Sequence, residues 1–224
     1  MLAYHCVRRC VFKLPAFHKG PRLCRATSTA TSATLTSIEK DLESLQQVVN
    51  AYRQNPKLQN SVEQVANLIV NAPGIKVTGI GKSGYVGQRM SATLASIGIP
   101  SQFIHGTEWY HGDLGSVREN ELIFGITHSG KTAELVDLVP LVKDRGANFC
   151  SLIGVEDSPL EKLSDSCILA PVTSEILGKV PSRSIVSQEA LINALAYNVV
   201  QLTGFTEAGF VRNHPGGSIG QQGK

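Results

Sequence analysis

The chain has 224 residues, of which 42% are hydrophobic, so it is long enough to form a large domain with a buried core. This composition excludes a wholly disordered protein. The sequence contains no run of about 18 apolar residues, so a membrane-spanning helix is not expected. The net charge of +3 is uneven, because residues 1–38 contain six basic residues and no acidic one, which leaves 15 basic and 18 acidic residues in the remainder. The main part of the chain is therefore mildly acidic, and neither nucleic acid nor a membrane is expected as a partner.

The basic leader, residues 1–36, has the composition of an organellar transit peptide. It is rich in arginine and hydroxyl side chains, and charges interrupt its apolar residues, whereas a secretory signal needs an unbroken apolar stretch. We expect a mitochondrial location, with a cytoplasmic or plastid location as the alternatives. A disordered basic tail would have the same composition. Cys150 and Cys167 are too few for a disulfide framework, and no C-x-x-C pattern predicts a metal site.

Residues 37–224 are expected to form one domain that begins with two helices. A capping-box pattern, Thr36 with Glu39, precedes apolar residues at helical spacing up to Tyr52, and a second helical pattern covers residues 61–69. Short apolar runs then predict strands at residues 75–80, 101–105, 121–127, 148–153 and 166–169. Amphipathic stretches predict helices at residues 85–97, 132–144, 159–163 and 184–202.

This alternation of strands and helices predicts an α/β protein. The expected architecture is a three-layer α/β/α sandwich with a central parallel sheet of about five strands, covered by helices on both faces. Ligands of such folds bind at the carboxyl ends of the strands. The loops that follow the strands are therefore the expected place of the functional residues.

The loop after the first strand, Gly79-Ile-Gly-Lys-Ser-Gly84, matches the G-x-G-x-x-G pattern of dinucleotide sites. Such a site also needs an acidic residue about 20 residues further on, at the end of the second strand, and this strand ends in Ile-His105-Gly. A nucleotide P-loop would need a glycine where the chain has Lys76. Neither nucleotide motif is complete, and nothing is provided for an adenine.

A second loop of this kind, Thr127-His-Ser-Gly-Lys-Thr132, follows the third strand and leads into a helix. Amides at a helix N-terminus, unhindered by Cβ atoms, bind anions. Two such loops on one sheet predict a site for one phosphate monoester, formed by Gly81, Ser83, Gly84, Thr127, Ser129, Gly130 and Thr132. In the alternative interpretation, the serine and threonine side chains only cap the two helices.

Two further motifs accompany these loops, His111-Gly-Asp-Leu-Gly115 and His214-Pro-Gly-Gly-Ser-Ile-Gly220. With the four motifs in this order, over about residues 40–220, the chain resembles the sugar isomerase (SIS) domain of arabinose-5-phosphate isomerases. The resemblance implies a flavodoxin-like SIS domain that interconverts D-arabinose 5-phosphate and D-ribulose 5-phosphate through an enediol, without an organic cofactor or a metal. It also implies a homodimer or homotetramer with sites near subunit boundaries.

The resemblance assigns catalytic roles to Lys82, His111, Glu134, Glu175 and His214. Lys82 would neutralise a phosphate or an enediolate, His111 would open the sugar ring or relay a proton, and Glu134 is a candidate base. Glu175 lies in a long loop from which a carboxylate could reach the ligand, and His214 lies in a turn rich in proline and glycine. The simpler alternatives are surface residues for Lys82 and Glu175, a structural histidine for His111, a C-terminal loop histidine for His214, and a helix-dipole partner for Glu134.

Two features depart from the family pattern. Residues 175–184 replace what is usually a proline followed by a hydroxyl-rich run, and this loop is expected to shape the sugar pocket. Another phosphosugar isomerase, such as a hexulose-phosphate isomerase, is therefore an alternative, and so are a non-catalytic sugar-phosphate sensor and a nucleotide-binding protein. Many family members continue into a pair of CBS modules, whereas this sequence ends at Lys224, so regulation through such modules is expected to be absent.

Overall fold

The central element of the fold is a parallel sheet. A computed structural model describes residues 32–221, and its strands are β1 (Ile75–Gly79), β2 (Ser101–His105), β3 (Leu122–Ile126), β4 (Asn148–Ile153) and β5 (Ser166–Leu169). The strands lie in the order β2-β1-β3-β4-β5, and each pairs in parallel with its neighbour. This is the strand order of flavodoxin-like folds, so the predicted fold class and the five predicted strands are confirmed.

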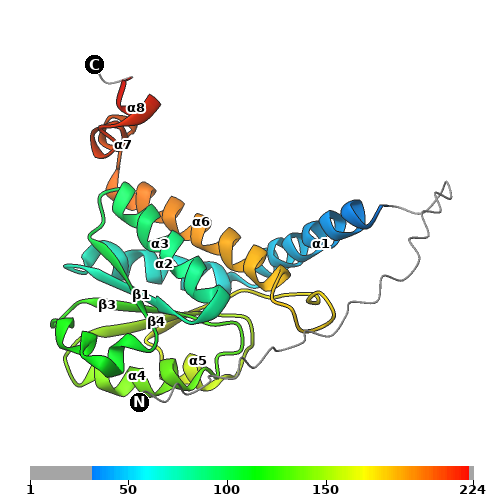
Figure 1. Cartoon of the computed structure of the whole chain (residues 1–224), viewed down its shortest axis with the longest axis horizontal. Coiled ribbons are helices and arrows are strands. Elements are labelled where there is room, and N and C mark those ends of the chain that lie inside the picture. Colours follow the sequence, from blue (N-terminus) through cyan, green and yellow to red (C-terminus); the bar gives the residue numbers. More distant parts are fainter. Residues whose placement is uncertain (1–31, 222–224) are drawn as a thin grey trace, which may run out of the picture. The chain divides into compact units, whose positions relative to one another are not determined.

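Helices cover both faces of the sheet (Figure 1). One face is covered by α2 (Pro56–Asn71), α3 (Gly81–Ser96) and α6 (Arg183–Thr203), and α1 (Ala33–Gln54) packs on α2 and α6. The other face is covered by α4 (Ala133–Lys143), α5 (Pro159–Leu163) and the 3-10 helices η1 (Glu108–His111) and η2 (Asp113–Ser116). The described chain ends with α7 (Glu207–Asn213) and α8 (Gly217–Gln221). None of the helices in residues 32–221 is long and apolar enough to cross a membrane.

Each face of the sheet has its own apolar core, because side chains alternate along a strand. In β3, Leu122 and Phe124 belong to the core beneath α2, α3 and α6, whereas Ile123 belongs to the core beneath α4. All residues of β1 and β3 are buried. Burial on both faces explains why continuous apolar runs, rather than alternating patterns, predicted these strands.

The two N-terminal helices begin earlier than predicted. α1 begins at Ala33, so the pattern of Thr36 and Glu39 lies inside the helix and does not mark its start. α2 begins at Pro56 because the Asn55 side chain caps it by accepting a first-turn amide hydrogen bond. The predicted leader lies outside the described residues up to position 31, and α1 includes its last four positions.

The direction of strand order reverses between β1 and β3, which are neighbours in the sheet. After β1 the chain enters α3 on one face, and after β3 it enters α4 on the other. In open α/β sheets this reversal creates a crevice at the carboxyl ends of the strands, where ligands bind. Both glycine loops, residues 79–84 and 127–132, follow these two strands and therefore lie at the crevice.

Candidate active site

The loop after β1 leads directly into an uncapped helix. Gly79 and Gly84 allow the strand and α3 to approach closely, since a Cβ on Gly84 would lie 3.1 Å from the Gly79 carbonyl oxygen. Gly81 has a φ of +61°, in the left-handed region that favours glycine. The N-cap residue of α3 is Ile80, whose apolar side chain gives the first-turn amides no hydrogen bond. Lys82 and Ser83 lie in this first turn.

The loop after β3 also leaves its helix without a side-chain cap. The Thr127 and Thr132 hydroxyl oxygens lie 2.7 Å apart and are hydrogen-bonded to each other, and the Ser129 hydroxyl accepts a backbone amide at 3.2 Å. Gly130 has a φ of +63°, and a Cβ at this position would collide with Ser158. Thr132 is the N-cap residue of α4, yet its hydroxyl makes no cap hydrogen bond with the described chain.

Both helix N-termini at the crevice are therefore open to a ligand. The alternative interpretation, in which the hydroxyl side chains only cap α3 and α4, does not describe these two loops. Uncapped amides at a helix start carry partial positive charge and bind anions. The structure brings the seven predicted binding residues to the ends of two neighbouring strands, and this arrangement suits one phosphate monoester.

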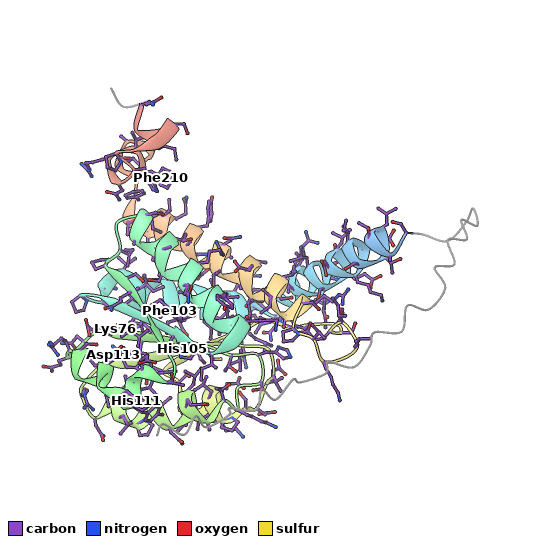
Figure 2. The ribbon with its side chains drawn as sticks, in the orientation of Figure 1. Lys76, Phe103, His105, His111, Asp113 and Phe210 are labelled. Carbon is purple, nitrogen blue, oxygen red and sulfur yellow. The ribbon has the colours of Figure 1, made fainter. Side chains whose placement is uncertain are left out.

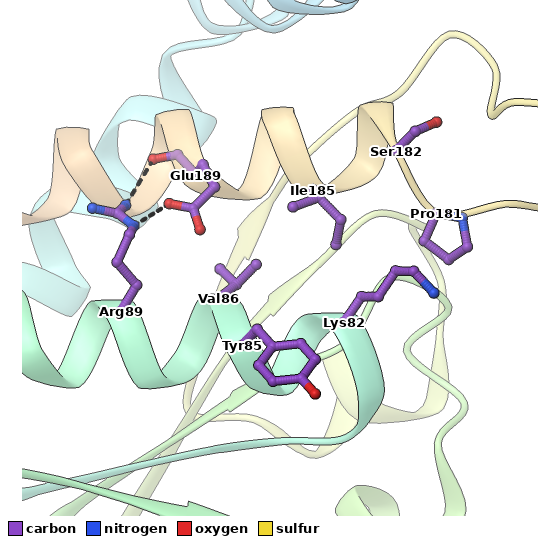
Figure 3. A pocket seen from close by; sticks show the side chains of 8 residues that line it. All are labelled: Lys82, Tyr85, Val86, Arg89, Pro181, Ser182, Ile185 and Glu189. Atoms are coloured by element: carbon purple, nitrogen blue, oxygen red, sulfur yellow. Dashed lines mark hydrogen bonds and ion pairs between the residues drawn. The ribbon is translucent and has the colours of Figure 1, made fainter.

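A pocket of about 500 Å³ lies beside the first loop, between α3 and α6 (Figure 3). Lys82 extends along it toward Pro181 and Ser182, and the ion pair of Arg89 with Glu189 lies at its other end. The remaining lining residues are Tyr85, Val86 and Ile185. Because Pro181 and Ser182 belong to the loop that departs from the family pattern, this loop borders the pocket that holds Lys82.

His111 is the last residue of η1, which lies near the start of α4. Trp109 anchors η1, because its ring is buried and its indole Nε1 donates a hydrogen bond at 2.8 Å to a threonine hydroxyl of β1. Tyr110 donates a hydrogen bond from its hydroxyl to the Glu134 carbonyl oxygen at 2.6 Å. Burial and the charges on Asp137 and Glu134 raise the pKa of Tyr110, so its hydroxyl stays protonated. This contact places the exposed His111 near the first turn of α4, and Figure 2 shows His111 on the side of the sheet that α4 covers.

Within one chain, His214 lies away from Lys82, and the role of both residues in one site stays a prediction. It is the C-cap residue of α7, and its ring stacks on Phe210 with the ring centroids 4.0 Å apart. Asn213 donates a hydrogen bond to the carbonyl oxygen of Ser96, the last residue of α3. Lys82 lies in the first turn of α3, and a helix of 16 residues spans about 24 Å. A single chain therefore does not bring the two side chains together.

The Glu175 side chain accepts hydrogen bonds from the backbone amides at the N-terminus of α6. Its carboxylate accepts hydrogen bonds from the amides of Ser182, Arg183 and Ser184 at 2.7, 2.9 and 3.3 Å, and from the Ser182 hydroxyl at 2.9 Å. Partial burial acts to raise the pKa of Glu175, but hydrogen bonds from Ser184, Ser182 and Arg183 outweigh it and keep the pKa below its usual value. The geometry supports a structural role for this carboxylate, while proton transfer by Glu175 stays a prediction.

We expect Glu175→Gln to destabilise the protein at neutral pH by about 1 kcal/mol, as the loss of a helix cap does. Because the pKa of Glu175 is lowered in the folded state, its stabilisation is present above its usual pKa of 4.5 and is lost as the pH falls through the folded-state value. Urea unfolding of both proteins from about pH 7 to about pH 3 should give free energies that differ at neutral pH and converge in acid. A difference that does not change with pH would contradict this role.

The described residues contain two free thiols and no cluster of possible metal ligands. Within residues 32–221, no three histidine, cysteine, aspartate or glutamate side chains gather as a metal site would require. Cys150 and Cys167 are free, and burial raises the pKa of Cys150 to about 12 and that of Cys167 to about 11. Both therefore stay protonated at neutral pH. A reaction without metal or organic cofactor stays an expectation.

A group of buried polar side chains that lies at the site was not predicted from the sequence. Ser184, Ser187 and Gln188 on α6 are buried, and the Ser83 hydroxyl donates a hydrogen bond to Gln188 Oε1 at 3.5 Å. Their spacing of i, i+3 and i+4 continues to the buried Leu191. Polar residues on the apolar face of a helix indicate a polar partner, so the signal was present in the sequence.

Comparison with known proteins agrees with the fold and the loops. The SIS domain model matches residues 68–197, more than half of the chain. Arabinose 5-phosphate isomerase KdsD of Pseudomonas aeruginosa is 38% identical over 157 residues, which cover 69% of this chain and 48% of KdsD. Arabinose 5-phosphate isomerase KpsF of Escherichia coli is 36% identical over 201 residues, which cover 88% of this chain and 57% of KpsF. The chain thus spans about half the length of these curated relatives.

A solved structure gives the same result over the whole of its length. The structure of an E. coli CFT073 protein in complex with arabinose 5-phosphate has a TM-score of 0.72 at 30% sequence identity, and the match covers 84% of this chain and 100% of that one. The flavodoxin-like strand order, the two open loops at the crevice and the matching family model agree with one another. The chain therefore belongs to the SIS domain family.

Proposed function

We propose that the protein is an aldose–ketose isomerase acting on a sugar phosphate, with D-arabinose 5-phosphate and D-ribulose 5-phosphate as the substrate pair. The observation that carries this proposal is the pair of uncapped helix N-termini at the β1/β3 crevice, with Lys82 in the first turn of α3. The similarity to two arabinose 5-phosphate isomerases and to a structure in complex with arabinose 5-phosphate supports this choice of sugar.

The reaction transfers one proton from C2 to C1 of the open-chain sugar. A base removes the C2 proton while an acid protonates the C1 carbonyl oxygen, which gives an enediol. Loss of the C2 hydroxyl proton and protonation of C1 then complete the ketose. The two loops bind the phosphate, Lys82 stabilises negative charge that develops on the oxygens, and His111 and Glu134 supply the acid and the base. The contact between Tyr110 and the first turn of α4 supports the pairing of His111 with Glu134.

A homodimer or homotetramer completes this site. The position of His214 beside the C-terminal end of α3 supports the view that its imidazole serves the site of another subunit. α1 also presents apolar side chains to solvent, since Ile38, Leu42 and Val49 are 59%, 64% and 40% exposed. Their spacing of four and seven residues places them on one side of the helix, as is typical of a surface that packs against a second copy.

We expect the double substitution Ile38→Glu and Leu42→Glu to convert the oligomer into monomers and to remove most of the activity. Two carboxylates on this stripe would have to be buried without partners in an interface, which opposes association. Light scattering measures the mass, and far-ultraviolet circular dichroism checks that the chain stays folded. Gln47→Glu, at an exposed polar position of α1, is the matched control. A wild-type mass equal to one chain would contradict the proposed oligomer.

The proposed activity is tested with purified protein and a panel of pentose and hexose phosphates. Conversion of arabinose 5-phosphate into ribulose 5-phosphate, without added metal or cofactor, is the expected result. If the protein converted a hexose phosphate but not arabinose 5-phosphate, the proposed substrate would be wrong. A rise in melting temperature with a sugar phosphate but without any turnover would overturn the enzyme in favour of a sensor. Stabilisation by NAD or ATP alone would point to nucleotide binding.

The proposed place of this activity is the mitochondrion. The acid-free, arginine- and hydroxyl-rich composition of residues 1–36 supports this location. Residues 1–36 fused to a fluorescent protein should direct it into mitochondria of a eukaryotic cell. A fusion distributed through the cytosol would contradict the proposal, and import into plastids would select the other organelle.

A further inference from the structure

The buried polar side chains of α6, Ser184, Ser187 and Gln188, include groups whose hydrogen-bonding capacity is not used within the described part of the chain. Ser187 and Gln188 are both 0% exposed. Within residues 32–221, neither Ser187 Oγ nor Gln188 Nε2 has a hydrogen-bond partner. Buried polar groups in folded proteins are nearly always hydrogen-bonded, so an amide left in this state needs an explanation.

Gln188 faces the loop after β1, residues 79–84. Its Oε1 atom lies 3.5 Å from the hydroxyl oxygen of Ser83, in the first turn of α3. In this arrangement the single hydroxyl hydrogen of Ser83 points toward Gln188. The hydroxyl then presents only lone pairs to a ligand. A phosphate oxygen is a hydrogen-bond acceptor, so a Ser83 hydroxyl held in this way would contribute nothing to phosphate binding.

Rotation of the Gln188 amide by half a turn removes this conflict. The oxygen and nitrogen of a side-chain amide have nearly the same size and shape, so the two orientations occupy the same space. In the second orientation, Nε2 donates a hydrogen bond to Ser83 Oγ and is no longer without a partner. The Ser83 hydrogen becomes free to point toward a phosphate oxygen, where a charge-assisted hydrogen bond is strong.

We propose that Gln188 is a positioning residue that donates a hydrogen bond from its amide to the Ser83 hydroxyl oxygen and so directs the hydroxyl hydrogen toward the phosphate of the substrate. The proposal rests on the proposed function, because it names a further determinant of phosphate binding at the same site. Gln188 itself does not touch the substrate, since its side chain is fully buried. It acts through Ser83, and its loss weakens binding while the chemical step is preserved.

A double-mutant cycle on the full chain tests this coupling. Calorimetry measures the Kd of arabinose 5-phosphate for the wild-type protein, Ser83→Ala, Gln188→Met and the double variant, and needs no turnover. Each single substitution should raise Kd about tenfold, or about 1.4 kcal/mol. The double variant should also be only about tenfold weaker, because Gln188 has no effect once the Ser83 hydroxyl is absent. Where turnover is measured, KM should rise while kcat stays unchanged.

Gln188→Glu distinguishes positioning from packing. The carboxylate has nearly the shape of the amide but only accepts hydrogen bonds, so it fixes the Ser83 hydrogen away from the phosphate, and it adds a negative charge. Gln188→Glu should therefore bind more weakly than Gln188→Met. Gln64→Met, at an exposed position of α2, is the matched control and should leave Kd unchanged. If Gln188→Met does not fold, Gln188→Asn, whose amide is one methylene too short for Ser83, replaces it in the cycle.

The outcomes separate this proposal from the function on which it rests. If the protein binds sugar phosphate but the two substitutions act additively, so that the double variant raises Kd about 100-fold, the role of Gln188 is wrong and the proposed function still holds. A lower melting temperature with an unchanged Kd would also overturn it, because Gln188 would then only fill space. A wild-type protein that binds no sugar phosphate would overturn the proposed function together with this inference.

Discussion

Lys82→Met should lower kcat/KM for the interconversion of arabinose 5-phosphate and ribulose 5-phosphate by about 100- to 1,000-fold. The Lys82 ammonium lies at the uncapped start of α3 and extends into the pocket between α3 and α6. Arg89, the other basic residue that lines this pocket, is paired with Glu189 and therefore cannot replace it. The loss should appear mainly in kcat if Lys82 stabilises the enediolate, and mainly in KM if it binds the phosphate.

Lys57→Met is the matched control for Lys82. Lys57 is an exposed lysine of α2, so its substitution removes the same charge from a part of the molecule outside the crevice. Its kcat/KM should stay within about twofold of the wild-type value, because a screened surface charge contributes little. Equal losses in both variants, or a Lys82→Met enzyme with nearly full activity, would contradict the role assigned to Lys82.

Trp109→Ala should destabilise the protein by about 3–5 kcal/mol, a large part of the stability of an ordinary domain. The indole ring is 1% exposed and belongs to the apolar core between the sheet and α4. Its Nε1 also donates the buried hydrogen bond to Thr78. The substitution therefore creates a cavity and leaves a buried hydroxyl without its partner. A shift of the urea midpoint at constant m-value measures the loss.

Two further variants separate the contributions of Trp109. Trp109→Phe keeps most of the ring volume but removes the donor to Thr78, and should cost about 1–3 kcal/mol. Tyr197→Ala removes an aromatic ring of α6 that is 66% exposed, and should change stability by less than about 0.5 kcal/mol. If Trp109→Ala were no less stable than Tyr197→Ala, the anchor assigned to η1 and His111 would be wrong.

The sheet and its loops could be predicted because their signals are local. β1 and β3 are buried along their whole length, so each appears in the sequence as a short apolar run next to a glycine-rich turn. Parallel pairing of neighbouring strands then brings the two loops to one edge. Helix starts are harder to predict from the sequence. The pattern of Thr36 and Glu39 lies inside α1, and the start of α2 is marked by Asn55 followed by Pro56.

The features of the site that could not be predicted from the sequence depend on contacts between segments that are far apart in the chain. Ser83 and Gln188 are 105 residues apart in sequence and meet only because α3 packs beside α6. Glu175 was predicted as a carboxylate near the ligand, but the four donors at the start of α6 engage it, which required knowledge of where that helix begins. The distance between His214 and Lys82 likewise follows from the docking of α7 beside the far end of α3.

An exchange measurement in D₂O tests whether this SIS domain catalyses proton transfer through an enediol. The protein is incubated with arabinose 5-phosphate in D₂O, and nuclear magnetic resonance follows the sugar. The expected product is ribulose 5-phosphate that carries deuterium at C1, and Lys82→Met should lower the rate of its formation by about 100-fold or more. Arabinose 5-phosphate that stays unchanged, with no ketose formed and no deuterium incorporated by the folded protein, would contradict the proposed reaction.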